Sequence, residues 1–376
     1  MANGIEMITW EDPAITARND YTGVWQSEVY TFDEPMSHIV PSWQLLGSDG
    51  PDGPQISVSI QATDSNGRYS HLRSFGSYAF DSEGEDMAMS SRRATANERP
   101  GPVGNVDQDT FVTNGDPIRA VRFNIWTHSP PGSPEFLVRS LSMVASNQYK
   151  IRQSAQEVYP SRPLSRSEVA LPVPAISQHN LDDVYPSLDG GGRTWCSPTS
   201  VAMNMAYWGV GPSPSELAQL PTVNGPAEAG AELYEPVAHA AYHIFDNRRH
   251  NKPTGNWSFN TAYAAHYGLD ARVVAYPDLR SVEERLQDGK PTVLTIDWDN
   301  ESIDLGRHLS GAHLVRSAGH LVVATGVTRE GDIRVNDPAA AGDDDVPTIY
   351  DRSQLERAWR RRGGWAYAID QRPGGL

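Results

Sequence analysis

The sequence has one cysteine, Cys196, in 376 residues, so no disulfide can form within the chain and a disulfide-stabilised fold is excluded. Basic residues are also scarce: 31 lysines and arginines stand against 47 acidic residues, and the formal net charge is −16. Nucleic acids and anionic membrane surfaces bind basic patches, so this balance argues against both as partners. No segment approaches the about twenty apolar residues that a transmembrane helix needs.

Residues 1–19 are polar and acidic, and they lack the apolar centre of a secretory signal peptide. If a signal peptide was removed from a longer precursor, we expect a secreted protein; otherwise we expect a cytoplasmic one. The cysteine count does not decide between the two, because a single thiol cannot report on disulfide formation.

The length predicts two domains, because single hydrophobic cores stop growing at about 250–300 residues. Residues 1–146 contain short alternating segments separated by turn residues, and the turn Asp64-Ser65-Asn66-Gly67 is typical of a β-hairpin. This pattern predicts an antiparallel, jelly-roll-like β-sandwich. Residues 147–168 contain prolines and arginines and are expected to link the sandwich to a second domain over 169–376.

Four tryptophans in the predicted sandwich admit two interpretations. Tryptophans on the face of a sandwich can stack on sugar rings, which makes a glycan a candidate partner of this region. Core packing explains the same residues equally well. The four are Trp10, Trp25, Trp43 and Trp126.

Cys196 lies where a helix is predicted to begin. Pro198 marks the first turn, an apolar run follows, and Gly209 closes the helix. The unpaired N–H groups of a helix N-terminus lower the pKa of a thiol and so favour the reactive thiolate. A free cysteine is also often a buried, inert core residue. The segment around Cys196 therefore leaves both interpretations open.

A second segment supplies partners for such a thiol. His320 precedes the apolar run 321–324, which is typical of a strand buried on both faces. A turn and an alternating strand over 329–338 complete a hairpin that brings His320 near Asp337. A carboxylate can hold one imidazole nitrogen and leave the other to accept a proton from a thiol. Cys196, His320 and Asp337 are thus a candidate nucleophile site.

These segments resemble the cysteine peptidases related to the double-glycine leader peptidases of bacteriocin exporters, which belong to the papain-like superfamily. The resemblance covers about residues 168–371. It implies a papain-like α+β domain in which helices come first and a sheet with a hairpin follows. Its motifs are Val173-Pro174-Ala175-Ile176-Ser177-Gln178, Trp195-Cys196-Ser197-Pro198-Thr199-Ser200, Gly319-His320-Leu321 and Asn336-Asp337-Pro338.

The resemblance implies four site residues. Cys196 matches the nucleophile, His320 the general base, and Asp337 the residue that orients the base. Gln178 matches the glutamine whose side-chain amide helps to bind the oxyanion. Asn336 is an alternative to Asp337, because papain-like sites also accept asparagine in that role.

Two features depart from the family pattern. Eighteen positions separate Gln178 from Cys196, whereas papain-like enzymes usually have only a few, and the insert 180–194 is expected to form a surface loop. A purely structural role for Gln178 therefore stays open. Ser197 stands where many relatives have glycine after the nucleophile, but its backbone N–H is retained and oxyanion binding is not excluded.

The residues predict a cysteine peptidase or amidohydrolase that cleaves a peptide or amide bond through a thioester, with a peptide or protein as substrate. A transamidase or acyltransferase is an alternative, because an amine can intercept the same thioester. A noncatalytic binding protein of the same fold is another alternative, and the intact cysteine, histidine and aspartate argue against it.

We expect no metal and no other cofactor. His239 and His243 have i, i+4 spacing and His250 is nearby, but no glutamate follows His239 and no third ligand is evident. The acidic run 343–345 lacks the ligand alternation of an EF-hand. It is predicted to be a solvated turn.

Overall fold

The fold is that of a computed structural model. It describes residues 4–13, 22–46, 55–79, 88–90, 102–128, 137–151, 160–182, 184–185, 190–220, 234–246 and 253–372. The centre of the predicted linker, 152–159, and His250 lie outside the described residues. Within the described ranges, no helix is long and apolar enough to cross a membrane.

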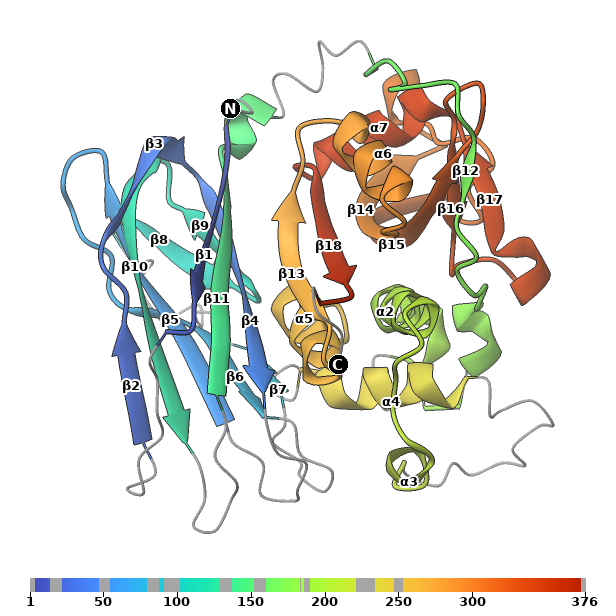
Figure 1. Cartoon of the computed structure of the whole chain (residues 1–376). Helices are drawn as coiled ribbons and strands as arrows, with labels where there is room; N and C mark the ends of the chain where they lie inside the picture. Colours follow the sequence, from blue (N-terminus) through green and yellow to red (C-terminus); the bar gives the residue numbers. More distant parts are fainter. Residues whose placement is uncertain are drawn as a thin grey trace.

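The N-terminal region consists of two antiparallel sheets, as predicted (Figure 1). The first has the strand order β1 (Ile5–Glu11), β11 (Leu137–Ser146), β4 (His38–Leu46), β9 (Thr110–Thr113) and β8 (Gly104–Asp107). The second has the order β2 (Thr22–Gln26), β10 (Ile118–His128), β5 (Gln55–Asp64), β6 (Arg73–Ala79) and β7 (Ala88–Ser90), with β3 (Tyr30–Met36) paired to β10.

Alternating side chains hold the two sheets together. Ile56, Val58 and Ile60 of β5 are fully buried, and they share one face because strand side chains alternate. Across the core, the Trp10 ring of β1 lies 5.7 Å from the Phe123 ring of β10. Burial of such apolar side chains between the sheets stabilises the sandwich.

Three of the four sandwich tryptophans contribute to packing. Trp43 is 1% exposed, and its ring lies 6.2 Å from that of Phe259 in the second domain. Trp10 and Trp25 form an edge-to-face pair with ring centroids 6.3 Å apart. Core packing therefore explains Trp43, and a glycan-binding role of this region stays a prediction.

The second domain is α+β, as predicted, and is built on a seven-stranded antiparallel sheet. The sheet order is β13 (Asp270–Ala275), β18 (Trp365–Asp370), β14 (Thr292–Asp299), β15 (Arg316–Val327), β16 (Ile333–Asn336) and β17 (Pro347–Tyr350), with β12 (Val169–Ala170) paired to β15. The helices are α2 (Cys196–Tyr207), α3 (Pro214–Leu217), α4 (Glu235–Ile244), α5 (Trp257–His266), α6 (Leu279–Gln287) and α7 (Arg352–Arg361).

Strand β15 is buried on both faces because helices cover each side of the sheet (Figure 1). Leu321 and Val323 belong to the core that includes side chains of α2 and α5. Val322 and Ala324 belong to a second core, with side chains of α6 and α7. The continuous apolar run in the sequence follows from this double burial, and it fixes His320 at the point where the run begins.

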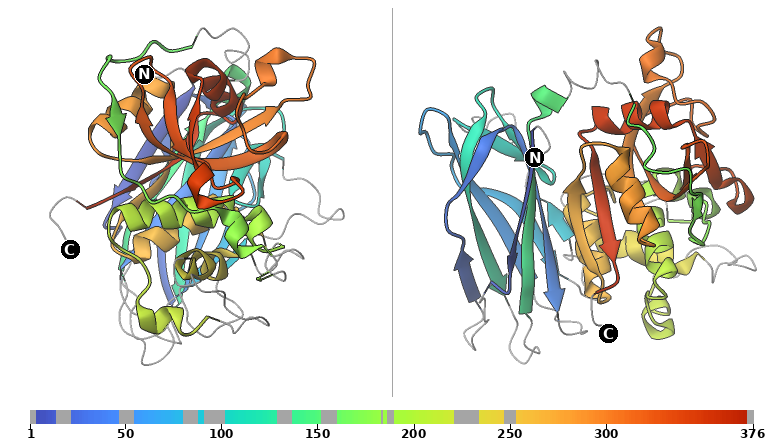
Figure 2. Two further views of the ribbon diagram at one scale, coloured as in Figure 1. Left: turned by 90° about the vertical axis from the view of Figure 1, so that its right-hand side faces the viewer. Right: turned by 45° about the horizontal axis from the view of Figure 1, so that its top comes forward.

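The sandwich and the second domain pack directly against each other (Figure 2). Strand β4 lies on α5 and β13. The Gln44 amide donates a 2.5 Å hydrogen bond to Asp270 Oδ1, and the Ser258 hydroxyl donates a 2.7 Å bond to the Pro41 carbonyl. Buried apolar residues of both regions form one continuous core. The sandwich and the second domain therefore share part of one hydrophobic core.

Candidate active site

Cys196 is the first residue of α2 and is half-buried. Trp195 before it is fully buried, and Ser197 after it is 1% exposed, so the sulfur is held on a rigid helix start. The first N–H groups of a helix have no partner within the helix. Their partial positive charge therefore lies at the start of the helix that carries Cys196.

His320 and Asp337 meet across the β15–β16 hairpin. The register pairs Val323 with Asn336, so the strand that starts at His320 lies beside the strand that leads into Asp337. His320 Nε2 lies 2.7 Å from Asp337 Oδ1, and both side chains are almost fully buried. The Cys196 side chain also interacts with the His320 imidazole and contributes to its raised pKa. Three residues that are distant in sequence are thus brought together.

The charges of this group favour an imidazolium. Burial lowers the pKa of His320, but the Asp337 charge, the hydrogen bond to Asp337 and the interaction with Cys196 outweigh burial and raise that pKa to about 10. Burial conversely raises the pKa of Asp337, but His320, Tyr350 and the Ala339 N–H together lower it to about 2. At neutral pH the aspartate is therefore ionised and the histidine protonated.

Tyr350 and Trp298 complete the surroundings of the pair. The Tyr350 hydroxyl donates a 2.5 Å hydrogen bond to Asp337 Oδ2, which holds the carboxylate from the side opposite His320. The Trp298 ring packs edge-to-face on His320 with centroids 5.6 Å apart. Because Trp298 is 1% exposed, it helps to exclude water from the His320–Asp337 hydrogen bond.

The structure brings Gln178 close to the nucleophile segment despite the insert. Gln178 begins a short 3₁₀ helix, and its Nε2 donates a 2.9 Å hydrogen bond to the Arg193 carbonyl. An isolated β-bridge between Asp182 and Gly191 closes the two ends of the insert. A Cβ atom on Gly192 would lie 2.1 Å from the Gln178 carbonyl oxygen, so only glycine allows this approach. The two ends of the insert therefore lie side by side, and Gln178 stays close to the segment that contains Cys196.

Asp343 fixes the Gln178 segment to the segment that follows Asp337. Its Oδ1 accepts hydrogen bonds of 2.7 Å from the Ser177 N–H and from the Asn180 side chain. Its Oδ2 accepts a 2.9 Å bond from the Tyr234 hydroxyl. The acidic run at 343–345 was predicted to be a solvated turn, and that prediction is wrong for Asp343, whose carboxylate is used in structure.

Asn336, the alternative to Asp337, has a different role. Its Nδ2 donates to the carbonyls of Val173 and Pro174, at 3.1 and 2.9 Å. These bonds tie β16 to the segment before Gln178. The partner of His320 is therefore Asp337.

The other histidines lie in another environment. His239 Nδ1 is 2.9 Å from the Tyr263 hydroxyl, and the His239 and His243 rings are 4.1 Å apart. Burial lowers the pKa of His239 to about 4 and that of His243 well below its ordinary value. Among the described residues, no group of three potential metal ligands occurs.

Sequence reasoning did not find three residues of the site. Trp298, Tyr350 and Asp343 act through contacts that connect separate strands and loops. Tyr350 and Trp298 are inward-facing aromatics in strands, and sequence alone does not separate such residues from ordinary core residues. Asp343 lies in an acidic run, which is more often a solvated turn.

The fold defines the class of the protein: an all-β region of two antiparallel sheets followed by an α+β peptidase-type domain. Residues 170–367 match the Peptidase C39-like family, and residues 1–146 match the Peptidase C39 N-terminal domain. Since the first match spans more than half of the sequence, the chain belongs to the Peptidase C39-like family.

Solved structures show weak similarity. One is named as a C39-like peptidase from Bacillus anthracis; it is 19% identical, with 55% of this chain and 98% of that chain covered and a TM-score of 0.35. A fragment of prointerpain A from Prevotella intermedia is 15% identical, with 61% and 82% covered and a TM-score of 0.35. A structure of infectious bursal disease virus, strain Gx, is 10% identical, with 39% and 34% covered and a TM-score of 0.22. No curated protein sequence matches the chain.

Proposed function

We propose that this protein is a cysteine peptidase or amidohydrolase that cleaves a peptide or amide bond in a peptide or protein. Cys196 is the nucleophile, His320 the general base and acid, and Asp337 the residue that orients His320. One observation carries the proposal: the buried His320 imidazole hydrogen-bonds Asp337 and interacts with the Cys196 side chain at the same time. Membership of the Peptidase C39-like family supports the same assignment.

The first chemical step is attack of sulfur on a carbonyl. Because Nε2 of His320 is held by Asp337, Nδ1 is the nitrogen left to take the Cys196 proton. The raised pKa of His320 favours the resulting thiolate–imidazolium pair at neutral pH. The thiolate attacks the substrate carbonyl, and a tetrahedral oxyanion forms.

Two donors are available for that oxyanion. One is the Cys196 backbone N–H, which has no partner within the helix because Cys196 is its first residue. The other is the Gln178 side-chain amide, which has two N–H bonds and uses one for the Arg193 carbonyl. Each such donor contributes about 10²–10³ in rate.

The second half of the reaction returns the protein to its starting state. His320 gives its proton to the leaving amine, the C–N bond breaks, and a thioester to Cys196 remains. Water, deprotonated by His320, then attacks the thioester and releases the carboxylic acid and the thiolate. Asp337 keeps the imidazole in one orientation through both proton transfers.

Alkylation by iodoacetamide tests the nucleophile directly. We expect fast labelling at neutral pH in the wild type, none in Cys196→Ala, and much slower labelling in His320→Ala. Equal, slow labelling of the wild type and His320→Ala would contradict the proposal. A diverse peptide library read by mass spectrometry then identifies the bond cleaved, and it separates hydrolysed products from ligated products, which would indicate acyl transfer instead.

A further inference from the structure

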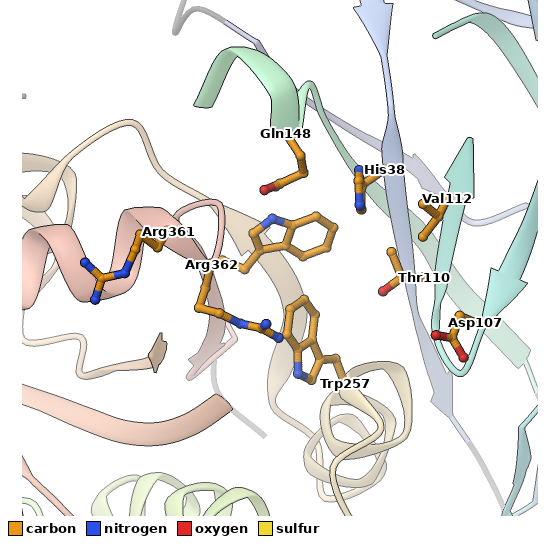
Figure 3. Close-up of a pocket in the computed structure, with 9 residues that line it drawn as sticks. His38, Asp107, Thr110, Val112, Gln148, Trp257, Arg361 and Arg362 are labelled. Carbon is orange, nitrogen blue, oxygen red and sulfur yellow. The ribbon is translucent and has the colours of Figure 1, made fainter. Parts of the chain in front are cut away.

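A pocket of about 200 Å³ lies between the two domains (Figure 3). The second domain contributes Trp257 at the start of α5, Arg362 after the end of α7, and Trp365 at the start of β18. The sandwich contributes Asp107 and Thr110 on either side of the β8–β9 turn. Pockets that enclose a whole drug-sized ligand measure about 300–1,000 Å³, so this pocket suits one side chain or a chain end.

The pocket adjoins the candidate active site through two routes. Trp365 and Tyr367 are two residues apart on β18 and therefore share a face, and the Tyr367 hydroxyl lies 3.1 Å from the hydroxyl of Ser197, next to the nucleophile. On the other route, a Cβ on exposed Gly319 would lie 3.7 Å from Arg362 Nη2, and Gly319 directly precedes His320. These contacts link the pocket to residues that directly follow Cys196 and directly precede His320.

Arg361 and Arg362 both line the pocket, yet their side chains differ. Arg361 is fully engaged: it donates 2.6 Å bonds to Oδ1 and the carbonyl of Asp297 and a 2.7 Å bond to the Gly306 carbonyl. The Arg362 side chain has no hydrogen-bond or ion-pair partner among the described residues, and its Nε is buried. A half-buried guanidinium without an anion is unfavourable unless a ligand supplies the anion.

Trp257 and Trp365 form an aromatic wall beside Arg362. The Trp257 and Trp365 rings are 4.9 Å apart, and the Arg362 guanidinium lies next to Trp257 (Figure 3). Asp109 of the β8–β9 turn accepts a 2.6 Å hydrogen bond from the Trp257 N–H, which ties the sandwich to the start of α5. The pocket therefore depends on both domains.

We propose that this interdomain pocket is a substrate subsite for a carboxylate carried beside an apolar group, with Arg362 binding the carboxylate and the Trp257–Trp365 wall contacting the apolar part. The planar guanidinium fork matches a carboxylate in two parallel hydrogen bonds. The carboxylate is either the C-terminus of a peptide or an aspartate or glutamate side chain. The inference rests on the proposed function, because it takes the substrate to be a peptide.

Binding to full-length Cys196→Ala separates the subsite from catalysis. The probes are acetyl-Gly-Phe with a free C-terminal carboxylate, the same dipeptide as its C-terminal amide, and acetyl-Gly-Phe-Glu amide, which carries only a side-chain carboxylate. We expect one of the two acids to bind about tenfold more tightly than the neutral amide by calorimetry, and the acid that does so identifies the source of the carboxylate.

Second substitutions assign that preference to one residue. Adding Arg362→Gln should remove the tenfold preference, and Arg362→Lys should keep part of it. Arg357→Gln, on α7 but outside the pocket, should leave the preference unchanged. The proposal would be overturned if the acids and the amide bound equally tightly. It would also be overturned if the Arg357 and Arg362 variants lost the preference for the acid to the same extent. Preferential binding of a neutral oligosaccharide such as maltotriose would also overturn it.

The two proposals fail in different ways. If wild-type protein labels at Cys196 and cleaves library peptides without any carboxylate preference, the subsite is wrong and the peptidase function stands. If Cys196→Ala shows the Arg362-dependent preference and the wild type neither labels nor cleaves, the subsite stands as a binding site and the peptidase function is wrong.

Discussion

His320 and His239 are each 2% exposed, yet their pKa values move in opposite directions. Burial lowers the pKa of both, because removal from water disfavours the charged form. At His320 the contact with Asp337 prevails and raises the pKa to about 10. At His239 burial prevails over the attraction of Glu216, and the pKa falls to about 4. A carboxylate in direct contact, rather than burial, therefore distinguishes the proposed catalytic histidine.

The same comparison predicts opposite effects of pH on stability. The stabilising contribution of His320 to the free energy of unfolding is fully present below the ordinary histidine pKa of 6.5. It is lost as the pH rises toward about 10. His239 must be neutral in the folded state, so stability is lost as the pH falls from 6.5 toward about 4. Each histidine thus limits stability on a different side of neutrality.

Removing the carboxylate should have the largest effect. Asp337→Ala leaves His320 buried without its partner, so its pKa should fall as at His239, and kcat for the best library peptide should drop about 10³–10⁴-fold. Asp337→Asn retains the shape and should also lose most activity. Asp345→Ala, an exposed acid in the adjacent turn, is the control and should retain wild-type kcat. A small loss in both Asp337 variants would show that the contact is not needed.

Gln178→Ala should lower kcat about 10²–10³-fold and leave the His320 pKa and the rate of iodoacetamide labelling nearly unchanged. Alkylation forms no oxyanion, so the two assays separate a donor to the transition state from a general disturbance of the site. Gln219→Ala, outside the site, serves as the control. Parallel loss of labelling and kcat would assign Gln178 a structural role.

Tyr350→Phe removes one hydrogen bond to Asp337 and should have a moderate effect. The pKa of Asp337 should rise from about 2, because a donor that stabilises its charge is lost. We expect about a tenfold loss of kcat/KM and an acid limb of the pH profile that moves to higher pH. Tyr207→Phe, which only loses a bond to the Gly289 carbonyl, should leave the limb in place. An unchanged limb in Tyr350→Phe would contradict this positioning role.

The smallest effect on activity is expected for substitution of His239. His239→Gln should leave kcat unchanged and should make the free energy of unfolding less sensitive to pH between about 4 and 6.5, since one buried histidine with a lowered pKa is then removed. Urea unfolding at several pH values measures this slope. A large loss of activity in this variant would place His239 in the site.

Sequence reasoning reached the residues whose pattern is local. The helix start at Cys196 and the apolar run after His320 correspond to α2 and β15, and the predicted hairpin brings Asp337 to His320. The two-sheet region and the α+β order were also predicted. These features follow from periodicity and turn residues, which the sequence records directly.

The other features of the site and of the domain interface depend on tertiary contacts, which the sequence does not display. The end of the insert lies beside Gln178 because Gly192 packs closely against the Gln178 carbonyl oxygen and because Asp182 and Gly191 form a β-bridge. The hydrogen bonds of Asp343 to the Gln178 segment form only when these distant segments meet. The same holds for the packing of Trp43 against Phe259 of the second domain. The sequence also does not distinguish Arg362, which has no side-chain partner among the residues that the structure describes, from the hydrogen-bonded Arg361 next to it.

The ¹⁵N chemical shifts of the His320 imidazole at neutral pH test the central claim most directly. With Asp337 on one nitrogen and Cys196 thiolate on the other, both nitrogens should be protonated, and Cys196→Ala or Asp337→Asn should shift the titration to lower pH. A singly protonated, neutral ring in the wild type, like that expected for His239, would contradict a thiolate–imidazolium pair.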